Sequence, residues 1–181
     1  MSNVGRQKGF FDLCCRSSKP IYQPTEQFMI SKLAAAVSLF VCVGSSSAKP
    51  PAEWQFKEWS EAVAQAETEK KPLFVLFGYE GCEWCEYLYR RGMNDAALRA
   101  KYQSSAILTY IDTKSHRPEE EFTLPGGAKI AHGELIKRFQ AYPTPSWIFL
   151  SSNGATLGSN RSGKTTAREM LRDVEQALAK Q

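Results

Sequence analysis

The stretch that most constrains this fold runs from residue 73 to residue 91. Residues 73–77 form an uninterrupted apolar run, Leu-Phe-Val-Leu-Phe, which is typical of a strand buried on both faces of a sheet. Gly81, Cys82 and Cys85 follow, and residues 86–91 are compatible with a helix. We therefore predict a central strand, a short loop and a helix that begins at the first cysteine.

The spacing of the two cysteines predicts a thiol–disulfide site. At the start of a helix, unpaired backbone N–H groups and the positive end of the helix dipole stabilise a thiolate, which is the nucleophilic form. Two intervening residues bring the second sulfur within about one helical turn of the first, close enough for a disulfide. Cys82 lies nearer the helix start and should be the more exposed, so we predict that it attacks. Cys85, one turn further and more buried, would resolve the mixed disulfide.

Two alternative readings use the same cysteines: half of a metal site, and an inert structural disulfide. A zinc site needs about four ligands, whereas beyond residue 48 the chain has no further cysteine and only His116 and His132. Two cysteines are also too few for a disulfide-stapled scaffold. We therefore favour redox chemistry with no metal and no other cofactor.

Charge and context argue against nucleic-acid and nucleotide binding. The net charge is +4, but residues 49–181 carry only +1 of it, too little for a basic face. Residues 158–165 match the phosphate-binding pattern G-x-x-x-x-G-K-[ST]. However, no later strand remains to supply a magnesium-binding acid. We read this stretch as a loop in which Thr165 or Thr166 caps the last helix.

Residues 29–48 have the pattern of an export signal. Lys32 precedes an apolar run over residues 33–43, and Ser46 and Ala48 form a small-residue cleavage site. The apolar run is too short to span a bilayer, which takes about 20 residues. We predict cleavage after Ala48, a periplasmic location, and a single domain over residues 49–181. Residues 1–28 are predicted to be unstructured, either as a translation artefact preceding a true start at Met29 or as a long cytoplasmic lead.

The remaining pattern predicts alternating helices and strands, and therefore an α/β class. A helix containing Trp54, Trp59 and Ala66 is expected before the central strand. A polar excursion over residues 113–131 should contain a small hairpin around Gly126 and Gly127. The other expected elements are helices at 94–102, 133–140 and 165–180, strands at 106–112, 146–150 and 155–157, and a tight turn at 152–154.

This order resembles the thioredoxin fold over roughly residues 53–180. The resemblance rests on Cys82-Glu83-Trp84-Cys85 and on Thr144-Pro145, which stands just before a strand. The chain further resembles the periplasmic SoxW-type thioredoxins, which carry a similar excursion before the Thr-Pro. The residues that carry this second likeness are Glu121-Phe122, Gly127, residues 133–139, residues 144–150 and Asn153-Gly154.

The resemblance implies a thioredoxin-like fold, with a central mixed sheet flanked by helices, and a thiol–disulfide oxidoreductase. In that family the Thr-Pro peptide is cis and lies beside the cysteines, so Thr144 and Pro145 are expected to bind substrate. Substrates would be disulfides of exported proteins, and a membrane thiol carrier would supply electrons. A reductase is favoured, with an oxidase or isomerase, or a non-catalytic client- or metal-binding module, as alternatives.

One departure from thioredoxin concerns the residues that tune the pair. Glu83 and Trp84 stand where thioredoxin has Gly and Pro. A carboxylate at Glu83 disfavours a nearby thiolate but also favours a helix N-terminus, while Trp84 is a possible contact for client proteins. Leu76 occupies the position of thioredoxin's buried aspartate, which leaves Glu80, Glu86 or water as the base for Cys85.

Overall fold

The computed structural model describes residues 49–115, 120–161, 163 and 166–181. The predicted export signal, the segment before it, and His116 lie outside these residues. The described chain contains a four-stranded mixed sheet in the order β2-β1-β5-β6. Strand β1 pairs parallel with β2 and antiparallel with β5, and β6 pairs antiparallel with β5. The four strands are β1 (Leu73–Gly78), β2 (Ile107–Asp112), β5 (Ser146–Leu150) and β6 (Thr156–Asn160).

Strand β1 is central and buried along its whole length, as its unbroken apolar run predicts. Successive side chains of a strand point to opposite faces of the sheet. Accordingly Phe74 and Leu76 belong to one core, whereas Leu73, Val75 and Phe77 belong to the other. An alternating polar strand could not fill this position, because both of its faces meet a hydrophobic layer.

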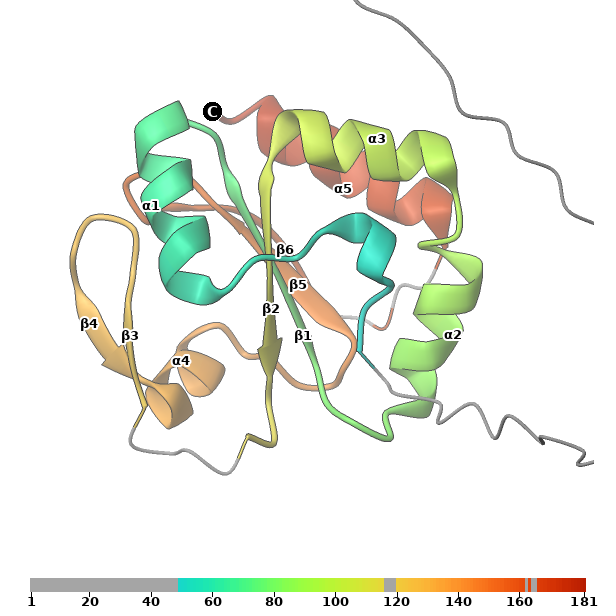
Figure 1. The fold of residues 1–181 in the computed structure, drawn as a ribbon, viewed down its shortest axis with the longest axis horizontal. Helices are drawn as coiled ribbons and strands as arrows, with labels where there is room; N and C mark the ends of the chain where they lie inside the picture. The colour runs from blue at the N-terminus through green and yellow to red at the C-terminus, as the bar shows by residue number, and fades with distance from the viewer. Residues whose placement is uncertain (1–48, 116–119, 162, 164–165) are drawn as a thin grey trace, which may run out of the picture. The chain divides into compact units, whose positions relative to one another are not determined.

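Each face of the sheet is covered by its own group of elements (Figure 1). One face carries α2 (Glu83–Arg91), α3 (Ala96–Ser105) and α5 (Ala167–Leu178). The other face carries α1 (Trp59–Glu69), α4 (His132–Arg138) and a hairpin of β3 (Glu121–Thr123) and β4 (Lys129–Ala131). This is the predicted α/β architecture with a mixed sheet between helices. Among the described helices, none is both long and apolar enough to cross a membrane.

The helix ends follow local sequence signals. Gly92 is the C-cap of α2. The Asp95 side chain accepts a hydrogen bond of 2.9 Å from the Leu98 backbone N–H at the start of α3. Thr166, one of two predicted caps, forms a capping box with Glu169 at the start of α5.

The structure corrects the predicted first helix. Trp54 is not part of it but closes a short 3-10 turn, η1 (Ala52–Trp54), and α1 begins only at Trp59. The chain between them cannot be helical, because Gln55 has a φ of 55° and Lys57 forms a β-bridge with Thr109. Trp54 is nevertheless fully buried, and its indole N–H donates to the Met93 carbonyl at 2.8 Å.

The structure differs from the sequence-based expectation in two further places. The polar excursion forms the predicted hairpin, but it also contributes Phe122 and Leu124 to the core beneath α1. The spacing of α5 predicts that Leu171 faces inward together with Met170 and Val174, but Leu171 is 38% exposed. Met170 and Val174 make the buried stripe, and Leu171 is turned about 100° from Met170 around the helix.

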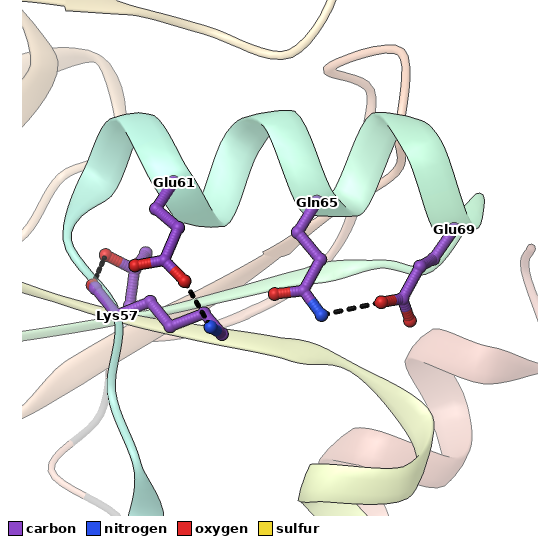
Figure 2. A network of polar contacts seen from close by, with 5 residues as sticks. Lys57, Glu61, Gln65 and Glu69 are labelled. Carbon is purple, nitrogen blue, oxygen red and sulfur yellow. Dashed lines mark hydrogen bonds and ion pairs between the residues drawn. The ribbon is translucent and has the colours of Figure 1, made fainter.

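The outer face of α1 is a row of polar contacts (Figure 2). Lys57 pairs with Glu61, and Gln65 donates to Glu69 at 2.6 Å. Gln65 and Glu69 are four residues apart within α1, which places both on one side of the helix, whereas Lys57 reaches Glu61 from the β-bridged segment before α1. These contacts lie on the exposed face, opposite the buried stripe of Ala62 and its neighbours, and far less stabilisation is expected from them than from the core.

Candidate active site

The cysteine pair sits where β1 turns into α2. Gly81 has a φ of 81°, a conformation that side chains disfavour, and it makes the turn between the strand and the helix. Cys82 is the N-cap of α2, and its sulfur accepts a hydrogen bond from the Cys85 backbone N–H at 3.2 Å. The two cysteines form a disulfide with their Cα atoms 5.2 Å apart. Cys82 therefore lies in the anion-favouring environment that its position predicts.

Both sulfurs are more enclosed than we expected. Cys82 is only 2% exposed and Cys85 is fully buried. The predicted order holds, but the difference between the two is small. Part of the cover on Cys82 comes from Thr144, a residue 62 positions later, which a prediction from local sequence could not place.

The Thr144-Pro145 segment lies against Cys82. Because a disulfide sulfur carries no proton, the Thr144 hydroxyl is the donor in its 3.4 Å contact with Cys82 Sγ. The Thr144-Pro145 and Tyr142-Pro143 peptide bonds are both cis. Strand β5 begins at the next residue, Ser146, whose hydroxyl donates to the Ala141 carbonyl at 2.9 Å. Pairing of β5 with β1 thus brings this loop to the cysteines.

The residues between and around the cysteines point outward. Glu83 is exposed in the first turn of α2, and Glu86 follows it on the same turn. Trp84 is 65% exposed, and its ring meets Tyr87 edge to face with centroids 5.9 Å apart. The exposed rings of Trp84 and Tyr87, next to the carboxylates of Glu83 and Glu86, therefore border the disulfide.

Tyr79, Tyr142 and Trp147 could line a substrate groove or only pack, and the structure gives the three aromatic side chains different environments. Trp147 is fully buried, and its indole N–H donates to Asp173 at 3.2 Å, so it is a packing residue. Tyr142 is half exposed and donates to the Thr113 carbonyl at 3.1 Å. Tyr79 lies under the Lys114 ammonium group, which is 3.4 Å from its ring centroid.

Sequence reasoning missed the surroundings of Cys85. The residue six positions before Cys82 is Leu76, which is fully buried and has no ionisable group. Instead Tyr110, on β2, comes close to Cys85 across Gly78. No local signal in the sequence points to this contact, because it depends on the β1–β2 register, in which Tyr110 stands beside Leu76.

The alternative sites gain no support from the described residues. Within them, no group of three or more His, Cys, Asp or Glu side chains is placed to hold a metal ion. Gly158, the first glycine of the phosphate-binding pattern, lies in the edge strand β6, antiparallel to its neighbour. A phosphate-binding loop follows a strand and opens a helix. Ser162, Lys164 and Thr165 of that pattern lie outside the described residues.

A mixed sheet with a disulfide at the start of the helix after its central strand is the arrangement of thioredoxin-fold thiol–disulfide oxidoreductases. The chain belongs to the thioredoxin-like domain family, whose sequence model matches residues 59–178. A comparison with curated protein sequences gave no significant match.

Solved structures share the fold at low sequence identity. A thioredoxin from Thermus thermophilus is 18% identical with a TM-score of 0.54, covering 69% of this chain and 87% of its own. A structure described as DsbH oxidoreductase is 19% identical with a TM-score of 0.53, covering 69% and 84%. A putative disulphide-isomerase from Bacteroides thetaiotaomicron is 21% identical with a TM-score of 0.53, covering 68% and 91%. At these identities the likeness supports the fold.

Proposed function

We propose that this protein is an exported thiol–disulfide reductase that acts on disulfides of other exported proteins in the periplasm. The observation that carries the proposal is the Cys82–Cys85 disulfide at the N-terminus of α2, in a thioredoxin-like domain. A helix start favours thiolate on Cys82, and Cys85 is close enough to attack Cys82 Sγ in a mixed disulfide and displace the client sulfur.

The reaction assigns one role to each cysteine. In the reduced protein the Cys82 thiolate attacks a client disulfide, forms a mixed disulfide and releases one client thiolate, which takes a proton from water. Cys85 then loses its proton and attacks Cys82 Sγ. The Cys82–Cys85 bond forms, and the second client sulfur leaves as a thiolate and is protonated. The client gains two electrons, and the protein is oxidised.

Thr144 and Pro145 are proposed to hold the client. Thr144 already contacts Cys82, so an extended client segment that reaches this sulfur must pass the Thr144 backbone. Backbone hydrogen bonding to such a segment is a common mode of peptide recognition. The exposed ring of Trp84, which lies between the two cysteines in the sequence, offers the client an apolar contact.

The direction of exchange is proposed from charge and from the SoxW-type resemblance. Glu83 lies next to Cys82 and disfavours its thiolate, which opposes the helix dipole. A strongly oxidising site requires an unusually stable thiolate, so a reductase fits better. Electrons would then come from a membrane thiol carrier. Oxidase or isomerase activity at the same cysteines is the second candidate.

The equilibrium of the cysteine pair with glutathione tests the direction. We expect a reduction potential at or below about −200 mV, whereas a value near −120 mV would assign an oxidase. The roles of the sulfurs are tested by alkylating the reduced protein and mapping the peptides. Cys82 should label first, Cys82→Ser should lose exchange, and Cys85→Ser should accumulate mixed disulfides. Faster labelling of Cys85, or substrate capture by Cys82→Ser, would reverse the assignment.

Export is tested separately, because residues 1–48 lie outside the described structure. Expression of the full chain in an exporting bacterium, followed by N-terminal sequencing of the periplasmic fraction, should give a protein that begins at Lys49. Exported material that retains residues 1–28 would contradict the proposed processing.

A further inference from the structure

The environment of the resolving cysteine, Cys85, opposes the ionisation that its proposed role requires. Cys85 must become a thiolate to attack Cys82, yet it is fully buried, and burial raises the pKa of a thiol. The neighbouring position on β1 that could hold an acid is the equally buried Leu76. Some other polar group has to stabilise the Cys85 thiolate.

Tyr110 is placed to do so. A Cβ atom added to Gly78 would lie 3.3 Å from Cys85 Sγ, 3.3 Å from the Tyr110 hydroxyl and 3.1 Å from Tyr110 Cε2. The sulfur and the phenol therefore flank one small space, which Gly78 keeps open by having no side chain. Tyr110 is the register partner of Leu76 and packs against the same core, so its phenol reaches the space from the adjacent strand.

A second phenol borders the same region. Tyr89 follows Cys85 by four residues in α2, which places both on one side of the helix. It is only 8% exposed, and within the described chain its hydroxyl has no hydrogen-bond partner. A buried hydroxyl without a partner is costly and calls for an explanation.

Both phenols stay protonated near neutral pH. Burial raises the pKa of Tyr110, and the carboxylates of Asp112 and Glu80 raise it further. Burial likewise raises the pKa of Tyr89, with smaller contributions from Tyr110 and Asp112. Neither can serve as the base, but each offers an O–H donor in a region where a thiolate accepts hydrogen bonds strongly.

We propose that the Tyr110 hydroxyl donates a hydrogen bond to the Cys85 thiolate once the Cys82–Cys85 bond is open. Tyr110 is thus a positioning residue that takes the place of a buried acid. The proton of Cys85 leaves to water, the thiolate forms on the sulfur held by Tyr110, and it attacks Cys82 Sγ as described above. This inference rests on the proposed thiol–disulfide function.

The test is the pH dependence of Cys85 alkylation in the reduced full chain carrying Cys82→Ser. Peptide mapping separates Cys85 from Cys14, Cys15 and Cys42. Adding Tyr110→Phe removes only the hydroxyl, and it should raise the midpoint of the alkylation profile by about one pH unit, or slow labelling about tenfold near neutral pH.

Tyr102→Phe is the matched control. Tyr102 is a buried tyrosine of the same core whose hydroxyl donates to the Met170 carbonyl at 2.9 Å. Its removal should lower the melting temperature without moving the Cys85 midpoint. An unchanged midpoint in Tyr110→Phe, or an equal shift in Tyr102→Phe, would overturn the role of Tyr110. Failure of the wild type to reduce any protein disulfide would instead refute the proposed function.

Discussion

Replacing Gly78 by alanine is the sharpest test of how tightly the site is packed. The new Cβ would lie 3.1–3.3 Å from atoms of Tyr110 and Cys85, closer than the ordinary contact distance of about 3.5–4.0 Å. Cys85 Sγ is held by its bond to Cys82, and the Tyr110 ring packs against the core, so both resist displacement. Overpacking of this kind costs about 1–3 kcal/mol.

A second glycine of the same sheet provides the control. Gly158 lies in β6, and a Cβ there would be 3.9 Å from Ala177 and 3.9 Å from Phe149, which is ordinary contact. Both substitutions restrict the unfolded chain equally, a gain of about 0.4–1 kcal/mol in each case. We therefore expect Gly158→Ala to be neutral or slightly stabilising and Gly78→Ala to be less stable than it by about 1–3 kcal/mol.

The assay is urea unfolding of the oxidised wild type and of both variants, followed by the rate of client disulfide reduction. Only Gly78→Ala should also slow exchange, because its Cβ displaces the resolving sulfur or Tyr110. If Gly78→Ala were as stable and as active as Gly158→Ala, the close approach of Cys85 and Tyr110 across Gly78 would be wrong.

Two further predictions concern stability away from the cysteines. Thr166→Ala removes the capping box with Glu169 and should destabilise the protein by about 1 kcal/mol in thermal unfolding, whereas Thr166→Ser should retain most of it. Burial raises the pKa of Tyr89, Tyr102 and Tyr110, so the unfolded chain loses these protons first. Stability should hold below about pH 10 and then fall, by up to about 1.4 kcal/mol per pH unit for each tyrosine. A spectroscopic titration in which all seven tyrosines ionise together while the protein stays folded would contradict this.

Much of the fold could be predicted from local patterns. The apolar run of β1, the capping residues Asp95 and Gly92, and the hairpin at Gly126 each act within a few residues, through burial, capping or turn geometry. The same holds for the place of Cys82 at the start of α2, since a strand, a loop and a helix in succession determine it.

Other features depend on what the chain meets after it folds. Trp54 has the spacing of a helix residue, yet the β-bridge between Lys57 and Thr109 interrupts the helix and sends the indole to Met93. By its spacing in the sequence Leu171 belongs to the apolar stripe of α5, but the helix is rotated so that Met170 faces the core and Leu171 does not.

The features of the candidate active site also separate into those set by local sequence and those set by tertiary contacts. The sequence by itself determined that two cysteines stand at the start of a helix, and the prediction that Cys82 attacks and Cys85 resolves rests on this local arrangement, because it follows from residues adjacent in the chain. Only the tertiary structure decided that Thr144 covers Cys82 and that Tyr110 stands beside Cys85. Those contacts arise from the pairing of β1 with β5 and with β2, and strand register is a property of the assembled sheet, which no single segment encodes.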